Sequence, residues 1–362
     1  MERRRFIAKA AVGTGAGIIA APALAQSRPA ITWRLASSFP RSLDTIFGAS
    51  DTFARRIAQL TNGRFTLRAF AEGEIASGLA VLDAVQAGAV ECGHSASYYY
   101  FGKDATFAFD CAVPFGLTSR QHTAWYEQGG GRELTRAFFR DYDIVNFLGG
   151  NSGTQMGGWF RKEVRSLAGL KGTRMRVAGF AGKVLERLGV VPQQLAGGDI
   201  YPALEKGTID AAEWVGPYDD EKLGFFKVAP FYYAPGWWEP SASFSFYVNS
   251  KAWDRLPKDY QAAVEVATYE AHLAMQAEYD VRNPAALARL LKNGVKLRTW
   301  PRDMMDACYK AASAVMEEEA SKNARFRKIY DPWKRFRQDQ NQWASVGEAP
   351  LQNYLISAGR RR

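Results

Sequence analysis

The chain has 362 residues, of which 47% are hydrophobic and 13% aromatic, and its formal net charge is +10. This length is enough for two domains with a sizeable core, and the composition excludes a largely disordered chain. The basic residues form no dense stripe, so a nucleic-acid-binding protein is disfavoured. Three histidines and three cysteines without Cys-x-x-Cys spacing leave little material for a zinc site or a Ser-His-Asp triad.

The first 25 residues have the pattern of an export signal. The arginines at 3–5 precede Phe6 and a short apolar run, which ends at Ala23-Leu24-Ala25, the A-x-A form that signal peptidase cleaves. The Arg-Arg-x-Phe pattern indicates the twin-arginine type. A membrane anchor is the alternative, but the run is too short and too glycine-rich to span a bilayer. We therefore expect cleavage after Ala25 and a periplasmic protein, whose net charge is +7 once four positive residues and one negative residue are removed.

The three cysteines allow two interpretations. Cys92 and Cys111 can pair in an oxidising compartment, which leaves Cys308 unpaired. Three buried free thiols fit the sequence equally well.

The chain after the signal alternates strand and helix patterns. Residues 31–37 alternate apolar and polar side chains, 42–61 place an apolar face at helical spacing, and 64–70 alternate again. Residues 77–97 then predict a helix, a stop at Gly88 and a strand. This order indicates an α/β unit with a parallel core.

The same pattern restarts near residue 145. Strands are predicted around 173–179 and 209–216 with helices between them, then a strand at 241–249, and helices from 257 to 337 interrupted by a strand candidate at 294–300. We therefore predict an α/β fold of the two-lobed periplasmic-binding-protein type, with a hinge between the lobes and a helical C-terminal region. The predicted divisions are 26–148 for the first lobe, 149–235 for the second, and 236–362 for a crossing strand back to the first lobe plus C-terminal helices. Ligands of open α/β sheets bind beyond the carboxyl ends of strands.

Two of these strand ends carry uncharged polar groups. Ser95 and the tyrosines at 98–100 follow one strand and would either wall a pocket for a small polar ligand or pack in the core. Asn151 and Gln155 lie among five glycines that permit tight turns and close backbone approach, without a phosphate-binding motif. The Gln155 amide oxygen can bind a hard cation or a hydroxyl, although an isolated glutamine is usually on the surface.

Two further strand ends carry charge. Arg174 and Arg176 share one face of a strand and either extend into solvent or place a guanidinium at a cleft to bind a carboxylate through two parallel hydrogen bonds. Asp210 and Glu213 are three residues apart, so on a strand they would point to opposite faces, with Glu213 nearer the ligand. An unpaired buried carboxylate is costly. Either a sodium or calcium ion shared with Gln155 and a backbone carbonyl, or a salt bridge from Glu213 to Arg176, would resolve that cost.

The stretch 232–240 crosses between the lobes. It places Trp238 where it can be a lid or a core residue, and Glu239 where it can be another cation ligand or a helix cap.

Together these segments resemble the substrate-binding proteins of TRAP transporters, the tripartite ATP-independent periplasmic systems, in the branch that binds 2-oxo acids and lactate. The resemblance covers essentially all of the mature chain. It is carried by "SASYYYFGKD", "VPFGLTSRQHTAWYEQGGGREL", "NSGTQMGGWFRKEV", "LKGTRMRVAGFAGKVLERLG", "DAAEWVGPYDD" and "PGWWEP".

The resemblance implies roles for individual residues. Arg176 would be the carboxylate clamp and Arg174 structural. A metal ion, sodium or calcium, would be held by Gln155, Glu213, the Trp214 backbone and, as a further candidate, Glu239. The remaining candidates for substrate binding are Ser95, Tyr99, Tyr100, Asn151, Trp214 and Trp238. The family also implies closure of the lobes, delivery to membrane subunits and, in this branch, a homodimer built with the C-terminal helices.

A chelated cation selects a ligand with a second oxygen next to the carboxylate, which describes 2-oxo and 2-hydroxy acids. Two carboxylates at the cation would favour calcium and one would favour sodium.

Two other classes of function compete with a receptor. An exported, metal-assisted enzyme acting on an oxo acid would need a nucleophile and a base, and His94 is the only histidine near a strand end. Residues 330–343 mix tryptophans with basic residues and could form an interaction module, although an amphipathic helix packed on the body explains them better.

Overall fold

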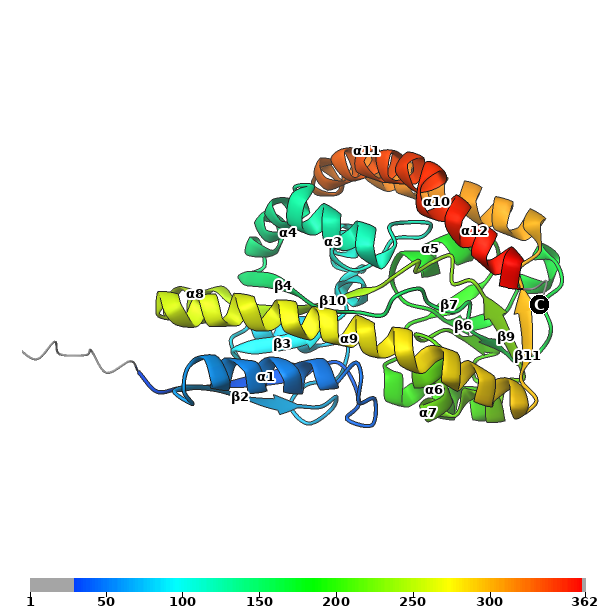
Figure 1. Ribbon diagram of the computed structural model, residues 1–362. Helices are drawn as coiled ribbons and strands as arrows, with labels where there is room; N and C mark the ends of the chain where they lie inside the picture. Colours follow the sequence, from blue (N-terminus) through cyan, green and yellow to red (C-terminus); the bar gives the residue numbers. More distant parts are fainter. Residues whose placement is uncertain (1–28, 360–362) are drawn as a thin grey trace, which may run out of the picture.

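The structure is a computed structural model that describes residues 29–359. The predicted export signal lies outside the described residues. Two β-sheets form the centres of two lobes, and long helices from the C-terminal third lie against both (Figure 1). Within residues 29–359, no helix is both long enough and apolar enough to cross a membrane.

The first lobe is built on a five-stranded sheet in the order β2-β1-β3-β10-β4. β1 pairs in parallel with β2 and β3, as the predicted strand–helix–strand order requires, whereas β10 is antiparallel to β3 and β4. The strands are β1 (Ile31–Ser37), β2 (Phe65–Phe70), β3 (Cys92–Ser95), β4 (Ile144–Asn151) and β10 (Ser243–Asn249), and the helices are α1 (Gly48–Leu60), α2 (Val81–Gln86), α3 (Ser119–Gln128) and α4 (Gly131–Arg140), with the 3₁₀ turns η1 (Ser97–Tyr100) and η2 (Ala105–Asp110).

The second lobe is built on a six-stranded sheet in the order β11-β9-β5-β8-β6-β7. β6 lies next to the edge strand β7 and pairs in parallel with β7 and β8. The strands are β5 (Trp159–Phe160), β6 (Arg174–Arg176), β7 (Val191–Gln193), β8 (Ala211–Ala212), β9 (Phe231–Ala234) and β11 (Lys296–Thr299), and the helices are α5 (Gly179–Arg187), α6 (Gly197–Glu205) and α7 (Pro217–Leu223), with the turns η3 (Leu167–Leu170) and η4 (Phe225–Lys227).

The predicted divisions can be placed on this topology. β4 remains in the first sheet as far as Asn151, so the division expected after residue 148 falls inside that strand. The division expected after residue 235 falls in the connection from β9 to β10. The domain limits themselves stay a prediction.

The C-terminal helices connect the lobes. After the short α8 (Ser250–Asp254), α9 (Lys258–Lys292) contacts α1 and β4 of the first lobe and α7 of the second. Its 35 residues correspond to a length of roughly 50 Å. α10 (Arg302–Lys322) lies on α5, and α11 (Ala324–Val346) lies on α3 and α4 and is followed by α12 (Glu348–Gly359) (Figure 1).

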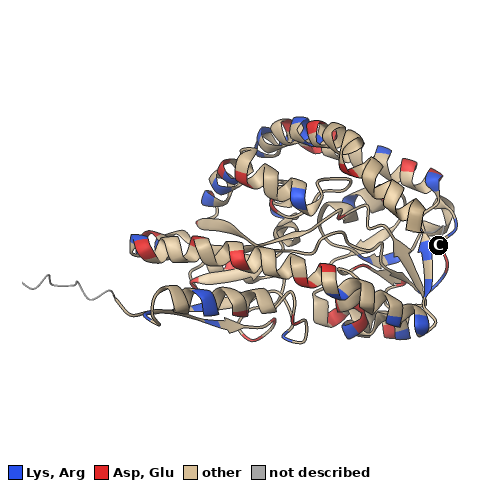
Figure 2. Ribbon diagram, viewed as in Figure 1, with Lys and Arg blue, Asp and Glu red and all other residues tan. Residues whose placement is uncertain are grey.

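α11 is the amphipathic helix expected for residues 330–343. Trp333 is buried with its ring 5.6 Å from that of Phe109, whereas Trp343 is 59% exposed. Basic and acidic residues are interspersed along the outer helices (Figure 2).

Direct contacts hold the lobes together. Asp44, which follows β1, accepts hydrogen bonds from Tyr218 of α7 and Arg282 of α9, both at 3.1 Å, and also pairs with Lys222. The Gln194 side chain of the second lobe donates to the Tyr99 carbonyl of the first at 2.9 Å.

The glycines of the 149–158 stretch let the crossing segments pack closely, as predicted. Gly158 has φ of +80°, and a Cβ there would lie 2.6 Å from the Ala212 carbonyl oxygen. A Cβ on Gly236 of the other crossing segment would lie 2.8 Å from the Gln155 carbonyl oxygen. A larger residue at either position would clash with the backbone of the neighbouring segment.

The three histidines are buried and bonded through both ring nitrogens. His94 contacts the Ser50 hydroxyl and the Gly149 carbonyl, His122 the Ser243 hydroxyl and the Phe109 carbonyl, and His272 the Thr123 hydroxyl and the Gly150 carbonyl, all at 2.9 to 3.2 Å. Burial lowers the pKa of His94 to about 3. His94 and His272 therefore hold the end of β4, and His122 joins η2 to β10.

The cysteines are free and buried, so the interpretation as separate thiols is the one that the structure adopts. Burial raises the pKa of Cys308 to about 12. None of the three thiols is activated.

His94→Gln should change the pH dependence of stability. The unfolded chain binds a proton near pH 6.5 and the folded chain only near pH 3, so protonation favours the unfolded wild type as the pH falls through this window. Glutamine lacks this titration. We expect the free energy of unfolding of the wild type to fall by about 2 kcal/mol relative to that of the variant between about pH 7 and pH 5. Denaturant titrations at both pH values measure this difference, and a pH-independent difference would contradict it.

Candidate functional site

Two arginine–carboxylate pairs connect β6 to β8. Arg174 binds Asp210 through two hydrogen bonds of 2.9 and 2.7 Å, and its side chain is 42% exposed. Arg176 pairs with Glu213 at 2.5 Å, and both side chains are at most 1% exposed. β8 comprises only Ala211–Ala212, so the alternation expected for a longer strand does not extend to either acid. The pair at the surface is structural, whereas the buried pair lies at the ends of the strands.

Three hydrogen bonds fix the Arg176 guanidinium, which is buried and does not extend into solvent. Its Nε donates to the Leu195 carbonyl at 3.1 Å, and its Nη1 donates to the Glu213 carbonyl at 2.8 Å and to Glu213 Oε1. Its Nη2 is buried and has no hydrogen-bond partner among the described residues. Burial alone would lower the pKa of Arg176, but Glu213 raises it, so the group stays charged. A fixed, buried guanidinium with a free N–H edge is suited to binding an anion.

Glu213 is satisfied on one oxygen only. Its Oε1 accepts from Arg176 and from the Ala178 amide at 3.1 Å, whereas Oε2 is buried without a hydrogen-bond partner in residues 29–359. Burial raises the pKa of Glu213, and Arg176 acts in the opposite direction. The salt-bridge alternative is thus realised on Oε1, and Oε2 remains available.

Gln155 and Glu239 complete this group. The Gln155 amide nitrogen donates to Ser152 at 3.2 Å, and its Oε1 is buried and unpaired within the described chain. The Gln155 backbone amide donates to the Glu239 carbonyl, and the next residue, Met156, donates to the Val215 carbonyl at 3.0 Å, so this segment lies against the one that follows Glu213. Burial first and then the charge of Glu213 raise the pKa of Glu239 well above its ordinary value.

Trp214 forms a wall beside the guanidinium. The Arg176 guanidinium lies 5.0 Å from the Trp214 ring centroid, a cation–π contact. A Cβ on Gly197 would lie 2.7 Å from this ring, and the Phe39 ring of the first lobe meets it edge-on at 6.5 Å. Trp214 is therefore enclosed by both lobes.

The three tyrosines point in different directions because they occupy a 3₁₀ turn, in which successive residues are about 120° apart. The Tyr98 hydroxyl donates to Glu239 at 3.4 Å. Burial raises the pKa of Tyr99, and the positive charge of Arg176 is the largest effect in the opposite direction. The Tyr100 hydroxyl instead meets Ser95 at 2.9 Å and accepts from the Leu82 amide, inside the first lobe.

Three further predicted residues are satisfied by protein groups. Ser95 bonds Ser38 at 2.6 Å as well as Tyr100. The Asn151 side chain donates to Ser243 at 2.9 Å and accepts from the Gly153 amide at 2.8 Å. In this closed arrangement Ser95, Tyr100 and Asn151 act as supports rather than open donors to a ligand.

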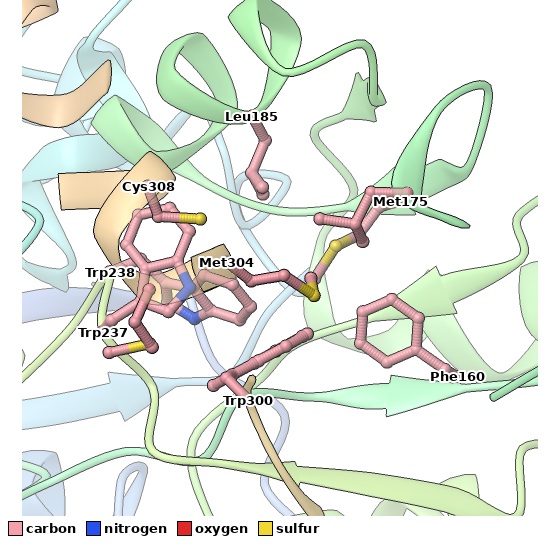
Figure 3. A pocket seen from close by; sticks show the side chains of 10 residues that line it. Phe160, Met175, Leu185, Trp237, Trp238, Trp300, Met304 and Cys308 are labelled. Atoms are coloured by element: carbon pink, nitrogen blue, oxygen red, sulfur yellow. The ribbon is translucent and has the colours of Figure 1, made fainter. Parts of the chain in front are cut away.

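Trp238 is packed among other apolar side chains. Its ring lies 4.9 Å from that of Trp237 and 5.9 Å from that of Trp300. These rings line a cavity of about 10 Å³. Figure 3 shows Trp237, Trp238 and Cys308 on one side, with Met175 and Phe160 on the other. The cavity is apolar and too small for an organic anion, and Trp238 is one of its buried lining residues.

Sequence reasoning missed Tyr98, Leu195 and Glu72 as members of this neighbourhood. Tyr98 was one of three equivalent tyrosines until the 3₁₀ turn separated them. Leu195 contributes a backbone carbonyl, which no residue type reveals. Glu72 lies in the loop after β2 and approaches Gly198 across the cleft, a contact that depends on closure.

The donor set fits a hard cation. The orphaned oxygens are one carboxylate oxygen of Glu213 and the amide oxygen of Gln155, with the Glu239 carboxyl beside them. Buried oxygen atoms without donors are costly, and Na⁺ or Ca²⁺ prefers an all-oxygen shell. Among residues 29–359, no cluster of three or more His, Cys, Asp or Glu side chains is arranged for a metal, so such an ion would depend on amide and backbone oxygens as well.

Comparison with known proteins identifies a matching family and a similar solute-binding protein. Residues 36–323 match the family described as DctP, bacterial extracellular solute-binding protein, family 7. The chain is 47% identical to the monocarboxylate 2-oxoacid-binding periplasmic protein of Nostoc sp. strain PCC 7120, over 99% of this chain and 100% of that protein.

Two solved structures of solute-binding proteins are similar to this chain over most of its length. A TRAP transporter solute-binding protein from Bordetella bronchiseptica RB50, a mixed-occupancy dimer with copurified calcium and picolinate, is 51% identical with a TM-score of 0.91, covering 92% of this chain and 99% of that one. A TRAP periplasmic solute-binding protein from Pseudoalteromonas atlantica T6c, with bound sodium and pyruvate, is 39% identical with a TM-score of 0.87, covering 90% of this chain and 99% of that one.

The matched length, the two-lobed fold and the identity to these relatives agree with one another, and the chain therefore belongs to the DctP family of bacterial extracellular solute-binding proteins, the periplasmic receptors of TRAP transporters.

Proposed function

We propose that this receptor captures a small 2-oxo or 2-hydroxy monocarboxylate, such as pyruvate or lactate, between its lobes and delivers it to TRAP membrane subunits. The observation that carries the proposal is the buried Arg176, whose free Nη2 lies in the same enclosed group as the unpaired oxygens of Glu213 and Gln155. A ligand carboxylate satisfies the nitrogen, and a cation satisfies the oxygens.

The cation also accounts for selectivity. When bound, it would supply an electrostatic bridge between the protein oxygens and the ligand. Gln155, Glu213, the Trp214 carbonyl and Glu239 would hold it. A ligand without an oxygen on the carbon next to the carboxylate would leave the cation short of a partner, which disfavours simple carboxylates. If Glu239 coordinates as a carboxylate, two negative charges favour calcium, and if it does not, sodium is favoured.

The relatives support this choice of ligand class. The structures that are 51% and 39% identical hold calcium with picolinate and sodium with pyruvate, and a structure from Colwellia psychrerythraea at 38% identity holds calcium with pyruvate. Family members are solute receptors and not enzymes. The three histidines of this chain are buried and hydrogen-bonded through both ring nitrogens, so none of them is free to act as a catalytic base.

Arg176→Lys should abolish tight binding. Lysine keeps a positive charge for Glu213 but lacks the planar fork that can bind two carboxylates at once. Losing charge-assisted hydrogen bonds worth about 3 kcal/mol should weaken pyruvate affinity at least about 100-fold. Isothermal titration calorimetry measures this change, and Arg174→Lys, at the exposed pair, should stay within about threefold of wild type. Unaltered affinity in Arg176→Lys would refute the clamp.

Metal removal tests the cation separately. After exhaustive chelation and exchange into sodium-free buffer, pyruvate affinity should fall at least about tenfold and recover when calcium or sodium is added, because a cation shared by ligand and protein is lost. Glu213→Gln should show the same loss without chelation, and Glu239→Gln should shift the preference from calcium towards sodium. Glu186→Gln, on the exposed face of α5, is the matched control. Undiminished binding by the wild type after both calcium and sodium are removed would favour the direct salt bridge alone.

We also propose a homodimer through the C-terminal helices. Trp343, Leu351, Tyr354 and Leu355 are 54–68% exposed on α11 and α12, and exposed apolar clusters of this kind are typical of interfaces. The Bordetella bronchiseptica relative is described as a dimer.

Trp343→Asp combined with Leu355→Asp should convert the dimer to a monomer in sedimentation velocity experiments. Placing charges in a buried apolar contact is strongly unfavourable. Tyr309→Asp, at a 50% exposed position on α10, is the control and should stay dimeric. A monomeric wild type at all concentrations would exclude this assembly.

A further inference from the structure

The segment 195–198, which leads into α6, lies directly behind the clamp. The Leu195 carbonyl accepts the Arg176 Nε hydrogen bond at 3.1 Å. Gly197 touches the Trp214 ring so closely that a Cβ would lie 2.7 Å from it. A charge placed against this segment therefore acts on both groups that enclose the ligand.

Glu72 brings such a charge from the other lobe. It follows β2, and its backbone amide donates to the Phe39 carbonyl at 3.1 Å, next to the ring that meets Trp214. Its Oε2 lies 3.9 Å from the position of a Cβ on Gly198. This oxygen is buried and has no hydrogen-bond partner of good geometry among the described residues.

Glu72 forms no ion pair with a lysine or arginine within residues 29–359. Burial raises its pKa, the Gly198 amide lowers it, Asp199 raises it and Arg176 lowers it, with a net increase. Glu72 in turn raises the pKa of Tyr99, after the stronger effects of burial and Glu213. The carboxylate thus lies within electrostatic range of Arg176 and Tyr99 on the first-lobe side of the cleft.

We propose that Glu72 is a specificity-determining residue that makes the closed receptor reject ligands with a second carboxylate. This inference rests on the proposed function. The single negative charge of a monocarboxylate is matched by Arg176 and the cation. A second carboxylate in the same closed cleft would be desolvated next to Glu72, and like charges brought together in this way disfavour the wrong partner.

A purely structural role for Glu72 has a different signature. If the side chain only stabilises closure by its contact with Gly198, its removal weakens every ligand by the same factor. If its charge selects, its removal improves dicarboxylates alone. The neighbouring Glu74 provides a matched control, because it is 44% exposed and is paired with Arg41 at 3.3 Å.

The test uses Glu72→Gln, which removes the charge and keeps the size, with Glu74→Gln beside it. Affinities for pyruvate and 2-oxoglutarate, which share the 2-oxo acid group and differ in the second carboxylate, are measured by isothermal titration calorimetry in calcium buffer. We expect Glu72→Gln to bind 2-oxoglutarate at least about tenfold more tightly than the wild type does, and pyruvate within about threefold. Glu74→Gln should leave both affinities unchanged, and thermal unfolding should verify that both variants are folded.

An unchanged ratio of the two affinities, or an equal loss for both ligands, would overturn the role of Glu72 while leaving the proposed function intact. A wild type that binds no pyruvate would instead overturn the proposed function, and this inference with it.

Discussion

The buried contact between Arg176 and Glu213 is the constraint on which the site depends. Removing two ions from water is costly, and their attraction offsets that cost only when the remaining hydrogen-bonding groups are satisfied. Here they are not, because the guanidinium keeps a free N–H edge and the carboxylate keeps a free oxygen. The site therefore contains two polar groups without partners in the described chain, one a donor on Arg176 and the other an acceptor on Glu213. Under the proposed function, an organic anion and a cation together would complete it.

The fold supports this pair through the second sheet. β6 supplies Arg176, the end of β8 supplies Glu213, and the segment before α6 supplies the carbonyl behind the guanidinium. The first lobe adds the tyrosine turn and Phe39 from the opposite side. Trp214 is enclosed only where both lobes contact it, so burial of the site requires contact between the lobes.

Sequence periodicity was sufficient for most of the framework. The alternation at 31–37 and 64–70 predicted β1 and β2, and the isolated pattern at 294–300 predicted β11, although β11 is an edge strand in which no residue is buried. Periodicity could not predict that β8 is two residues long, since its pairing with β5 and β6 ends where the crossing segments begin. Residue chemistry indicated Arg176, Gln155 and Glu213, which the structure brings together, although their roles remain proposals. It could not separate Tyr98 from Tyr100, because that depends on the 3₁₀ turn, and it missed Glu72, whose partner is 126 residues away in the other lobe.

The continuous α9 has a mechanical consequence. Its first half packs on α1 and β4, and its second half is tied to α7 by Tyr279, which donates to Asp219 at 2.7 Å. Pro284, within the second half, lacks the N–H that would bond four residues back, so the rod is most compliant there. The two lobes are therefore connected by a continuous helix as well as by loops. Any separation of the lobes would have to bend α9 or break its contacts with one of them, so the stiffness of this helix would add to the energy of releasing a solute.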